Sequence, residues 1–394
     1  MIYCPINTLG HYLRVVSTRR IAYLSSADPN DKRAWSGIHA YLSASLEKHC
    51  GSVIPLGPWQ PEQLLKRDRL KAYLRRRMTG KRTDYLHSLR LANAYGAHFT
   101  EKLRRTECDC VFAVAASTEL AFTETKLPVY YVADATFANM VNYYPFYTGL
   151  SHKSVQEGHE IQKRALEKCT QLFFPSTWAA DSAMNDYGIS ASKIHVIPLG
   201  ANLENVPEVN IAPKSDDVVR LLFIGVEWER KGGPVVVDAF HELLRRGVNA
   251  QLTILGSSPP VSHERITIIP YLNKNVPGER EKLNALFAAS DFFMLPTTAE
   301  CYGLVFCEAS AFGVPSLAPD TGGVSGAIRN GVNGFLLPEK SPGVDYAKKI
   351  VELLSDKTRL LALRQSSLEL YRKELNWDAW GTRVQQIISA TQPR

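Results

Sequence analysis

The chain has 394 residues, of which 45% are hydrophobic and 22% are charged, and its formal net charge is +7. This length exceeds one ordinary hydrophobic core and suits two domains, and the composition excludes a fibrous or largely disordered chain. Seven cysteines without a Cys-X-X-Cys pair argue against a disulfide framework, and no run of about 18 apolar residues predicts a membrane span. Because the amino terminus also lacks the apolar core of a signal peptide, we expect a cytoplasmic protein.

The first half of the chain alternates short apolar runs with longer amphipathic ones. Residues 1–19 form an extension ahead of the first run. The runs predict strands at 20–25, 52–56, 108–116, 127–133, 171–174 and 194–197, and helices at 38–50, 151–169 and 176–187. This alternation is typical of an α/β domain with a parallel sheet. The stretch 198–217 is rich in Pro, Asn and acidic residues and lacks periodicity, so it is predicted to link two domains.

Two positions in this first domain follow predicted strands and are candidates for contact with a ligand. Gly37 stands at a strand-to-helix turn, where a glycine lets a ligand approach the helix amides, although turn geometry alone explains it equally well. Asp134 follows the strand at 127–133, and a carboxylate there can orient a hydroxyl group or help accept its proton. The aromatic run at 142–147 (NYYPFY) can stack on an acceptor or pack in the core.

A strongly basic stretch runs from Lys66 to Arg82, with nine basic residues against one acidic residue. Leu70, Tyr73, Leu74 and Met78 recur within it at helical spacing. Such a basic amphipathic helix can lie on an anionic membrane surface, and a solvated helix is the alternative. A nucleic-acid partner is not expected, because the stretch has no nucleic-acid-binding motif and no alternation of basic and aromatic residues.

The second half of the chain repeats the strand-helix pattern. Strands are predicted at 219–224, 251–255, 266–269, 291–295 and 335–337, and helices at 279–289, 304–312, 344–354, 358–375 and 377–390, with one more from Pro234. The sequence therefore predicts two doubly wound, Rossmann-like α/β domains that face each other across a cleft, at 1–205 and 206–375.

The turn after the strand at 219–224 carries two cations. Gly225 is followed by the run VEWERKGG, which contains Arg230 and Lys231. Two fixed cations beside a glycine turn can neutralise a diphosphate leaving group, whereas the alternative is a surface pair of cations. We take both residues as catalytic candidates.

The stretch 296–323, PTTAECYGLVFCEASAFGVPSLAPDTGG, places Glu300 and Glu308 eight positions apart around a predicted strand-to-helix turn. A helix that begins after such a turn directs unpaired backbone N–H groups at the crevice, which suits a phosphate. Glu308 can accept hydrogen bonds from a ribose diol, and Glu300 can do the same for sugar hydroxyls, although exposed glutamates are commonly only solvated. The predicted nucleotide-sugar site includes the backbone of Tyr302, Gly303, Leu304 and Val305.

The chain resembles a known family in this same stretch. Glu300-Cys-Tyr-Gly303, the run EASAFGVPS from Glu308 and the pair Gly322-Gly323 are similar to the donor-binding signature of the retaining GT-B glycosyltransferases of family 4, and the resemblance extends from Ser36-Gly37 to the C-terminal helix. It implies retaining transfer of a hexose from a UDP- or GDP-linked donor to a sugar or lipid-linked acceptor. It also implies that Gly37 faces the acceptor and the donor phosphates and that Tyr271 lies near the base. A C-terminal helix within 376–394 would then cross back to the first domain.

Two departures from that family keep alternatives open. Val226 stands where the family has an arginine, so that Arg230 is only a candidate for its role, and Asp134 stands where many members have a histidine. A GT-B protein that binds a nucleotide sugar or a partner without catalysis, and a nucleotide-sugar epimerase, are therefore the rival functions. No Asp-X-Asp element occurs, so we expect no essential metal or other cofactor. The basic stretch favours a lipid-linked acceptor and a peripheral position on the inner face of the membrane.

Overall fold

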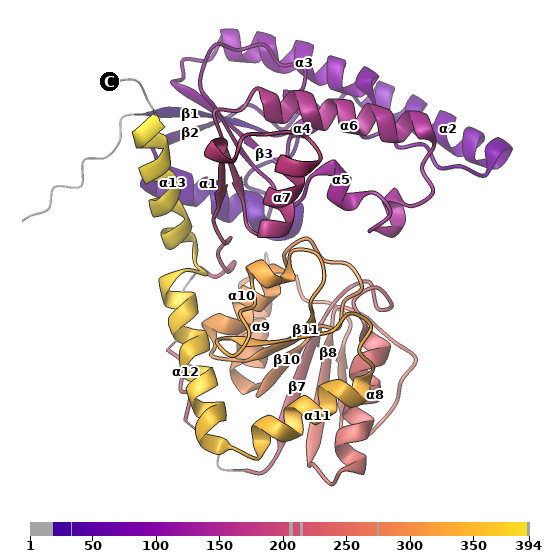
Figure 1. Ribbon diagram of the computed structural model, residues 1–394, viewed down its shortest axis with the longest axis vertical. Coiled ribbons are helices and arrows are strands. Elements are labelled where there is room, and N and C mark those ends of the chain that lie inside the picture. Colours follow the sequence, from indigo (N-terminus) through magenta and orange to yellow (C-terminus); the bar gives the residue numbers. More distant parts are fainter. Residues whose placement is uncertain (1–18, 33, 205–207, 213–215, 274–275, 392–394) are drawn as a thin grey trace, which may run out of the picture.

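Two α/β domains make up the computed structural model, which describes residues 19–32, 34–204, 208–212, 216–273 and 276–391 (Figure 1). Most of the predicted amino-terminal extension and parts of the predicted linker therefore lie outside the described residues.

The first domain is built on a six-stranded parallel sheet in the order β2-β1-β3-β4-β5-β6. Its strands are β1 (Arg20–Leu24), β2 (Ser52–Pro55), β3 (Cys110–Val114), β4 (Val129–Val132), β5 (Gln171–Phe174) and β6 (Ile194–Val196). Its helices are α1 (Ile38–His49), α2 (Glu62–Thr79), α3 (Leu89–Arg104), α4 (Ser117–Leu120), α5 (Phe137–Met140), α6 (His152–Glu167) and α7 (Thr177–Asn185), with short 3₁₀ turns η1 (Ala34–Gly37), η2 (Pro145–Tyr147) and η3 (Ala191–Lys193). Every residue of β3 and β4 is buried, which is why these strands read as continuous apolar runs rather than alternating ones.

The second domain repeats the architecture around a six-stranded parallel sheet in the order β12-β11-β10-β7-β8-β9. Its strands are β7 (Val219–Ile224), β8 (Ala250–Leu255), β9 (Ile266–Ile269), β10 (Phe292–Met294), β11 (Ser316–Pro319) and β12 (Gly334–Leu337). Its helices are α8 (Gly233–Arg245), α9 (Pro277–Ala289), α10 (Leu304–Ala311), α11 (Gly343–Leu354) and α12 (Lys357–Lys373), with the 3₁₀ turn η4 (Val324–Gly326). The predicted fold class, two doubly wound domains with parallel sheets, is therefore confirmed.

The last helix, α13 (Trp377–Thr391), returns to the first domain and packs along α1 (Figure 1). Ser45 Oγ donates a hydrogen bond of 2.6 Å to the carbonyl oxygen of Trp377, and Lys48 pairs with Asp378. The indole of Trp380 is fully buried and meets the ring of Phe112 edge-on, with 6.2 Å between the ring centroids. Helix α13 thus connects the second domain to the first.

Helix α3 is the main element that the sequence reasoning missed. Its first residue follows Ser88, whose side chain accepts a hydrogen bond from the Leu91 amide as a helix cap. Gly96 interrupts its apolar pattern, and a side chain at that position would collide with Phe122. The glycine that weakens the helical signal is therefore the residue that allows close packing.

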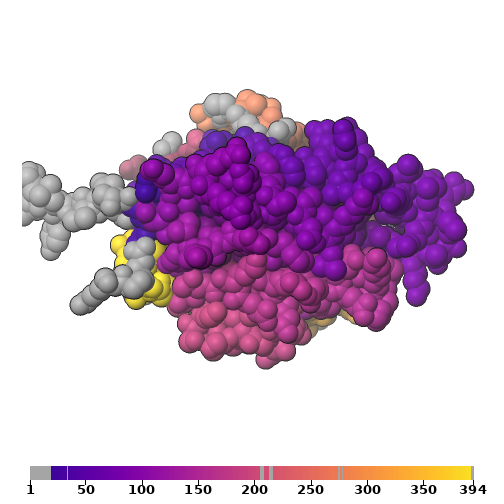
Figure 2. All heavy atoms as spheres, turned by 90° about the horizontal axis from the view of Figure 1, so that it is seen from above, coloured from indigo at the N-terminus to yellow at the C-terminus, as the bar shows by residue number. Residues whose placement is uncertain are grey.

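The predicted basic helix is present as α2, whose first half is joined to the domain by Leu64 and Leu65 against the core and by Asp68 paired with Arg90. None of its residues is buried, and it extends beyond the rest of the first domain in two perpendicular views (Figures 1 and 2). Leu70, Tyr73, Leu74 and Met78 are exposed by 58, 56, 50 and 85% respectively. The apolar residues that suggested an amphipathic helix thus face solvent together with the cations.

The described residues contain neither a membrane-spanning helix nor a cluster suited to a metal ion. No helix there is both long and apolar enough to cross a membrane. Likewise, the described His, Cys, Asp and Glu side chains form no group of three or more that could hold a metal ion.

Candidate active site

A cleft of about 530 Å³ lies between the two domains, at the carboxyl ends of their strands. The first domain lines it with Lys32, Trp35, Ser36, Ile38 and Asp134. The second domain contributes residues after β7, β8, β9 and β10: Ile224, Gly225, Val226, Glu227, Arg230, Lys231, Leu255, Gly256, Tyr271, Leu272, Asn273, Leu283, Glu300, Tyr302, Gly303, Leu304, Val305 and Glu308. Eleven of the twelve predicted site residues thus come together, and Gly37 lies between two lining residues without lining the cleft itself.

The turn between β7 and α8 holds Lys231 close to the turn after β10. Gly232 has a φ of +77°, and a Cβ atom there would overlap the carbonyl group of Pro296. A residue with a side chain would therefore be strained and would push the two turns apart. Gly225 has the matching role on the other side, since its own Cβ would lie 2.9 Å from the Cβ of Lys231. The two glycines fix the direction in which Lys231 enters the cleft.

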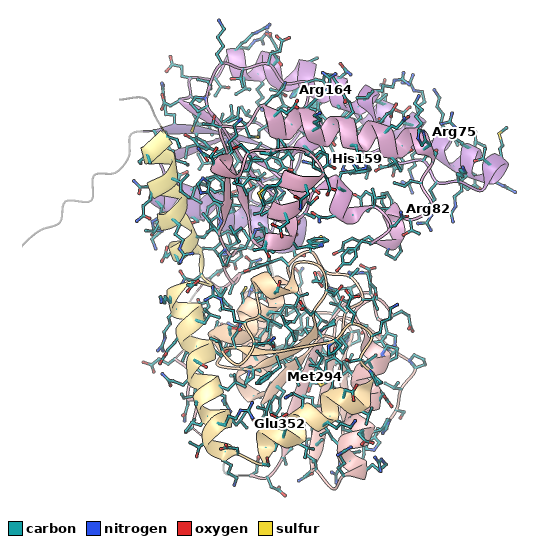
Figure 3. The ribbon with its side chains drawn as sticks, in the orientation of Figure 1. Arg75, Arg82, His159, Arg164, Met294 and Glu352 are labelled. Carbon is teal, nitrogen blue, oxygen red and sulfur yellow. The ribbon has the colours of Figure 1, made fainter. Side chains whose placement is uncertain are left out.

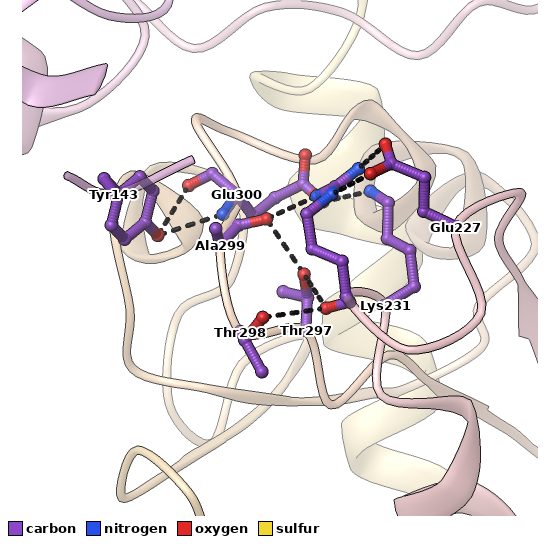
Figure 4. Close-up of polar contacts among 8 residues, drawn as sticks. Tyr143, Glu227, Lys231, Thr297, Thr298, Ala299 and Glu300 are labelled. Carbon is purple, nitrogen blue, oxygen red and sulfur yellow. Dashed lines mark hydrogen bonds and ion pairs between the residues drawn. The ribbon is translucent and has the colours of Figure 1, made fainter. Parts of the chain in front are cut away.

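Lys231 forms an ion pair with the carboxylate of Glu300 (Figure 4). Both side chains are largely shielded, with 18 and 13% of their surfaces exposed. In one cleft, a cation suits a phosphate and a carboxylate accepts hydrogen bonds from hydroxyl groups, so the pair suits a sugar phosphate. The predicted convergence of Glu300 and Lys231 is thus present in the fold.

Arg230 points to the same region but is occupied by protein groups. Its Nε and Nη2 donate to the carboxylate of Glu227 at 2.9 and 2.7 Å, and its Nη1 donates to the carbonyl oxygen of Ala299 at 2.6 Å. Figure 4 shows these bonds beside Lys231 and Glu300. Because Ala299 directly precedes Glu300, Arg230 fixes the backbone that presents the glutamate.

The residues from Gly303 onward start helix α10 at the edge of the cleft. Gly303 has a φ of +87°, and the helix begins at Leu304. The first amides of a helix have no intrahelical partner and carry the positive end of its dipole, so those of Leu304 and Val305 suit an anion. Glu308, 2% exposed, lies one turn further along and lines the same cleft.

The side chain of Tyr302 points away from this ligand-binding region. It is 1% exposed, and its hydroxyl donates to the carbonyl oxygen of Leu199 at 3.0 Å, across the domain boundary. Tyr302 is therefore available to a ligand through its backbone, while its ring helps to join the two domains.

Asp134 faces this site from the first domain. Its Oδ2 accepts a hydrogen bond of 3.2 Å from the indole Nε1 of Trp35. Burial raises the pKa of Asp134 to about 6, and the negative charge of Glu300 acts in the same direction. At neutral pH this carboxylate is mostly ionised, so it can accept a hydrogen bond or a proton from an acceptor hydroxyl.

The loop before α1 forms the wall next to Asp134. Trp35 and Ser36 have positive φ values of 47° and 57°, and Gly37 follows at 92°. The carbonyl oxygen of Ser36 accepts a hydrogen bond of 2.9 Å from the side chain of Asn202. Positive φ at two successive non-glycine residues is a strained conformation that surrounding contacts must hold. Gly37 permits this turn, whereas Trp35 and Ser36 face the cleft.

Gly256 and Tyr271 line the far end of the cleft, after β8 and β9. Gly256, after β8, has a φ of +96°, and a Cβ atom there would lie 3.2 Å from the backbone of Gly225. Tyr271 lines this end and is 63% exposed. The ring of Tyr271 is thus accessible in the cleft, where a flat group can stack on it.

Sequence reasoning missed several residues that shape the site. Glu227 belongs to the run VEWERKGG, and its spacing of three from Arg230 was the available signal for an ion pair. Trp35 immediately precedes Ser36-Gly37, but an isolated tryptophan gives no sign of what its indole donates to. Tyr143 and Tyr144 belong to the aromatic run for which acceptor stacking and core packing were both open, and they contact groups of the second domain.

Comparison with known proteins agrees with this geometry. Residues 218–356 match the family described as Glycosyl transferases group 1. Among curated proteins, the D-inositol 3-phosphate glycosyltransferase of Nocardia farcinica is 29% identical over 226 residues, which is 50% of this chain and 48% of that protein. The match to this relative thus spans about half of its length.

Solved structures resemble the chain over almost its whole length. The sucrose-phosphate synthase of Thermosynechococcus elongatus has a TM-score of 0.67 at 16% identity, covering 94% of this chain and 98% of that one. Anabaena Alr3699/HepE in complex with UDP-glucose has a TM-score of 0.61 at 15% identity, covering 94 and 100%. At these identities the likeness concerns the fold. The second domain thus matches the model of the glycosyl transferases group 1 family, and the chain as a whole has the GT-B fold.

Proposed function

We propose that the protein is a retaining glycosyltransferase that moves a hexose from a nucleoside diphosphate sugar to an acceptor hydroxyl. The observation that carries this proposal is the convergence of Lys231, Glu300, Glu308 and the start of α10 in one cleft between two Rossmann-like domains. Such a cleft offers a cation, unpaired amides and two carboxylates, which match the phosphates and the hydroxyl groups of a nucleotide sugar.

The diphosphate is the leaving group of this reaction, and Lys231 is its main cation. The bond between the anomeric carbon and the diphosphate oxygen breaks, and a bond from that carbon to the acceptor oxygen forms on the same face of the sugar. The proton of the acceptor hydroxyl passes to the departing diphosphate oxygen. Negative charge develops on the diphosphate, so Lys231 and the amides of Leu304 and Val305 stabilise the transition state more than the ground state.

The two glutamates hold the donor on either side of this centre. Glu308 accepts hydrogen bonds from the ribose hydroxyls, and Glu300 accepts them from the transferred sugar. Arg230 adds positive charge to the region, but its three bonds to Glu227 and Ala299 favour a positioning role over direct contact with the diphosphate. Tyr271 and the turn at Gly256 receive the base.

Asp134 and Trp35 belong to the acceptor side of the cleft. The ionised carboxylate of Asp134 orients the attacking hydroxyl, and the bond from the Trp35 indole holds that carboxylate in place. Packing of the two domains around both substrates excludes water, which otherwise competes as acceptor.

UDP- and GDP-linked hexoses are the donors that we propose to test first. The similar Anabaena protein is in complex with UDP-glucose, and the curated relatives act, by name, as glycosyltransferases of D-inositol 3-phosphate. A thermal-shift screen of UDP-, GDP- and ADP-sugars identifies the donor, because a ligand at 100 times its Kd adds about 2.7 kcal/mol of stability. Inositol phosphate and lipid-linked sugars are then the acceptors to supply.

The decisive experiment compares transfer rates of the wild type with those of Lys231→Ala and Glu308→Ala. Each well-placed group that acts on the transition state is worth about 3–4 kcal/mol, so the loss of Lys231 is expected to lower kcat roughly 100- to 1000-fold. Loss of Glu308 should weaken donor binding as well as transfer. Lys282→Ala removes an exposed lysine from α9 and is the matched control. Near-normal transfer by either site variant, with the fold intact, contradicts these roles.

The same assay separates the rival functions. A binding protein without catalysis shifts its melting temperature with a nucleotide sugar but hydrolyses none of it, even slowly, when the acceptor is omitted. An epimerase converts the donor alone into an isomer, which NMR detects. A retaining transferase gives a product with the anomeric configuration of the donor.

Helix α2 carries its cations on an arm that stands away from the body of the first domain, where Arg75 is labelled in Figure 3. Among the described residues, Lys71, Arg75 and Arg76 have no carboxylate within ion-pair distance. A groove of about 530 Å³ runs beneath the arm, and Leu74 and Met78 line it together with Lys71 and Arg75.

We propose that this arm rests on an anionic membrane surface and brings the cleft to a lipid-linked acceptor. Each cation near the headgroups contributes about 1 kcal/mol, and the exposed Leu70, Tyr73 and Met78 add apolar contact. The combination of unpaired cations with exposed apolar side chains on one projecting helix favours a lipid surface over a purely solvated helix.

A further inference from the structure

The loop that follows α5 in the first domain reaches into the site of the second domain. The hydroxyl oxygen of Tyr143 accepts a hydrogen bond of 2.9 Å from the backbone N–H of Glu300, 157 positions away in the sequence (Figure 4). The same oxygen lies 3.1 Å from Thr321 Oγ1. A side chain at position 322 would overlap this hydroxyl, so Gly322 allows the approach. Tyr143 thus joins the turn that carries Glu300 to the glycine turn after β11.

The next residue, Tyr144, contacts the other half of the same site. The guanidinium carbon of Arg230 lies 5.3 Å from the centre of the Tyr144 ring, within the range of a cation–π interaction. Burial raises the pKa of Tyr144, so its phenol stays neutral. The rings of Tyr143 and Tyr144 meet edge-on at 5.3 Å. Two adjacent tyrosines therefore contact this part of the site: Tyr143 binds the backbone of Glu300, and Tyr144 packs on Arg230, which in turn binds the backbone of Ala299.

This loop is fixed within its own domain. Asn142 has a φ of +59°, which asparagine tolerates, and its N–H donates to the carbonyl oxygen of Tyr147 at 3.2 Å. The side chain of Arg82 donates to the carbonyl oxygen of Pro145, and the ring of Tyr143 packs against Trp178 at 5.2 Å. Because the loop is held independently of the second domain, it can impose its geometry on the residues that it touches.

We propose that Tyr143 and Tyr144 are positioning residues that complete the donor site from the opposite domain. This inference rests on the proposed function. The hydroxyl of Tyr143 holds the backbone of Glu300, whose carboxylate pairs with Lys231, and the ring of Tyr144 holds the guanidinium of Arg230. The charged groups of the second domain reach their working geometry only when the first domain is packed against them. The donor site is then complete only once the two domains have packed together.

The test uses Tyr143→Phe, which removes one hydroxyl and keeps the ring against Trp178. Its matched control is Tyr147→Phe, which removes a hydroxyl from the same loop, where the ring packs on His87 and Phe137 within the first domain. We expect Tyr143→Phe to lower kcat of transfer about tenfold, with the donor KM within twofold of wild type. Tyr147→Phe should keep both constants within twofold.

A second variant pair addresses Tyr144. Tyr144→Phe keeps the aromatic face under Arg230 and should retain kcat within twofold, whereas Tyr144→Leu removes it and should lose about tenfold. Equal kcat values for Phe and Leu at this position would contradict the cation–π contact with Arg230.

Hydrogen exchange gives a readout that does not depend on activity. The amide of Glu300 is bonded to the Tyr143 hydroxyl, so its exchange should be at least tenfold faster in Tyr143→Phe than in Tyr147→Phe. Equal exchange in the two variants, or faster exchange with an unchanged kcat, overturns the proposal. If the wild type transfers no sugar at all, the proposed function fails, and exchange at Glu300 still decides whether Tyr143 positions it.

Discussion

Replacement of Asp134 by Asn tests the electrostatics of the acceptor side. Burial raises the pKa of this carboxyl group from 3.8 to about 6. A difference of one unit corresponds to about 1.4 kcal/mol, so the folded protein pays at most about 3 kcal/mol to keep Asp134 ionised at pH 7. Since the side chain is partly exposed, we expect about 1–3 kcal/mol. Asn keeps the shape and still accepts the hydrogen bond from Trp35.

The sign of the effect depends on pH. A raised pKa means that the folded state binds more protons than the unfolded state between pH 4 and pH 6, so this group lowers stability as pH rises through that window. The variant Asp134→Asn has no carboxyl group to ionise, so its stability does not fall in this way as pH rises. Its free energy of unfolding should therefore equal that of the wild type near pH 4 and exceed it by about 1–3 kcal/mol at pH 7.

Urea unfolding at several pH values between 4 and 8 measures this difference. The exposed Asp181 on α7 provides the control variant Asp181→Asn, which should show no such pH-dependent gain. Transfer activity should change in the opposite direction, since the variant lacks the carboxylate, and the wild-type rate should fall as pH drops below about 6. A stability difference that is the same at pH 4 and pH 7 refutes the burial of a charge at Asp134.

Two further predictions concern α2 and the turn at Lys231. Charge reversal at Lys71 and Arg75 should weaken binding to phosphatidylglycerol vesicles at least about 30-fold, from about 1 kcal/mol per cation lost, while binding to neutral vesicles stays weak in both proteins; equal binding of the two proteins would exclude α2 as the membrane contact. Gly232→Ala should lower stability by more than Gly247→Ala, since both have φ near +78° but only at Gly232 does a Cβ meet the carbonyl of Pro296. Similar losses in the two glycine variants, measured by urea unfolding, would mean that the second turn can move aside.

The sequence was most informative where a function depends on residues close together in the chain. The buried strands appear as apolar runs because parallel sheets are covered on both faces, and β7, β5 and β9 match their predicted limits. The turns at Gly225–Gly232 and Glu300–Gly303 were predictable because each combines a strand end, glycines and charged residues within a few positions. The structure brings those local groups together, including Lys231 and Glu300.

The hydrogen-bond partners of the site residues were harder to predict from the sequence than the residues' places in the site. Arg230 and Glu227 are three residues apart, yet only the fold shows that Nη1 of the arginine donates to the carbonyl oxygen of Ala299 and so holds the backbone before Glu300. Gly37 was read as a ligand contact because it stands at a strand-to-helix turn, whereas the strained conformation of the loop directs Trp35 and Ser36 toward the cleft. In both cases the residue type indicated a role at the site, whereas the direction of the side chain could not be predicted from the sequence.

The contacts of Tyr143 lay beyond sequence reasoning for a physical reason that also bears on mechanism. An aromatic loop can serve a site 157 positions away only after both domains are folded and packed, and no periodicity or spacing within the loop encodes that event. The second domain supplies Lys231, Glu300 and Glu308, through turns that its own strands position. The first domain supplies the constraint, since the Tyr143 hydroxyl holds the amide of Glu300 in place. Chemistry that depends on both can proceed only with the domains together, which is also when water is excluded from the cleft.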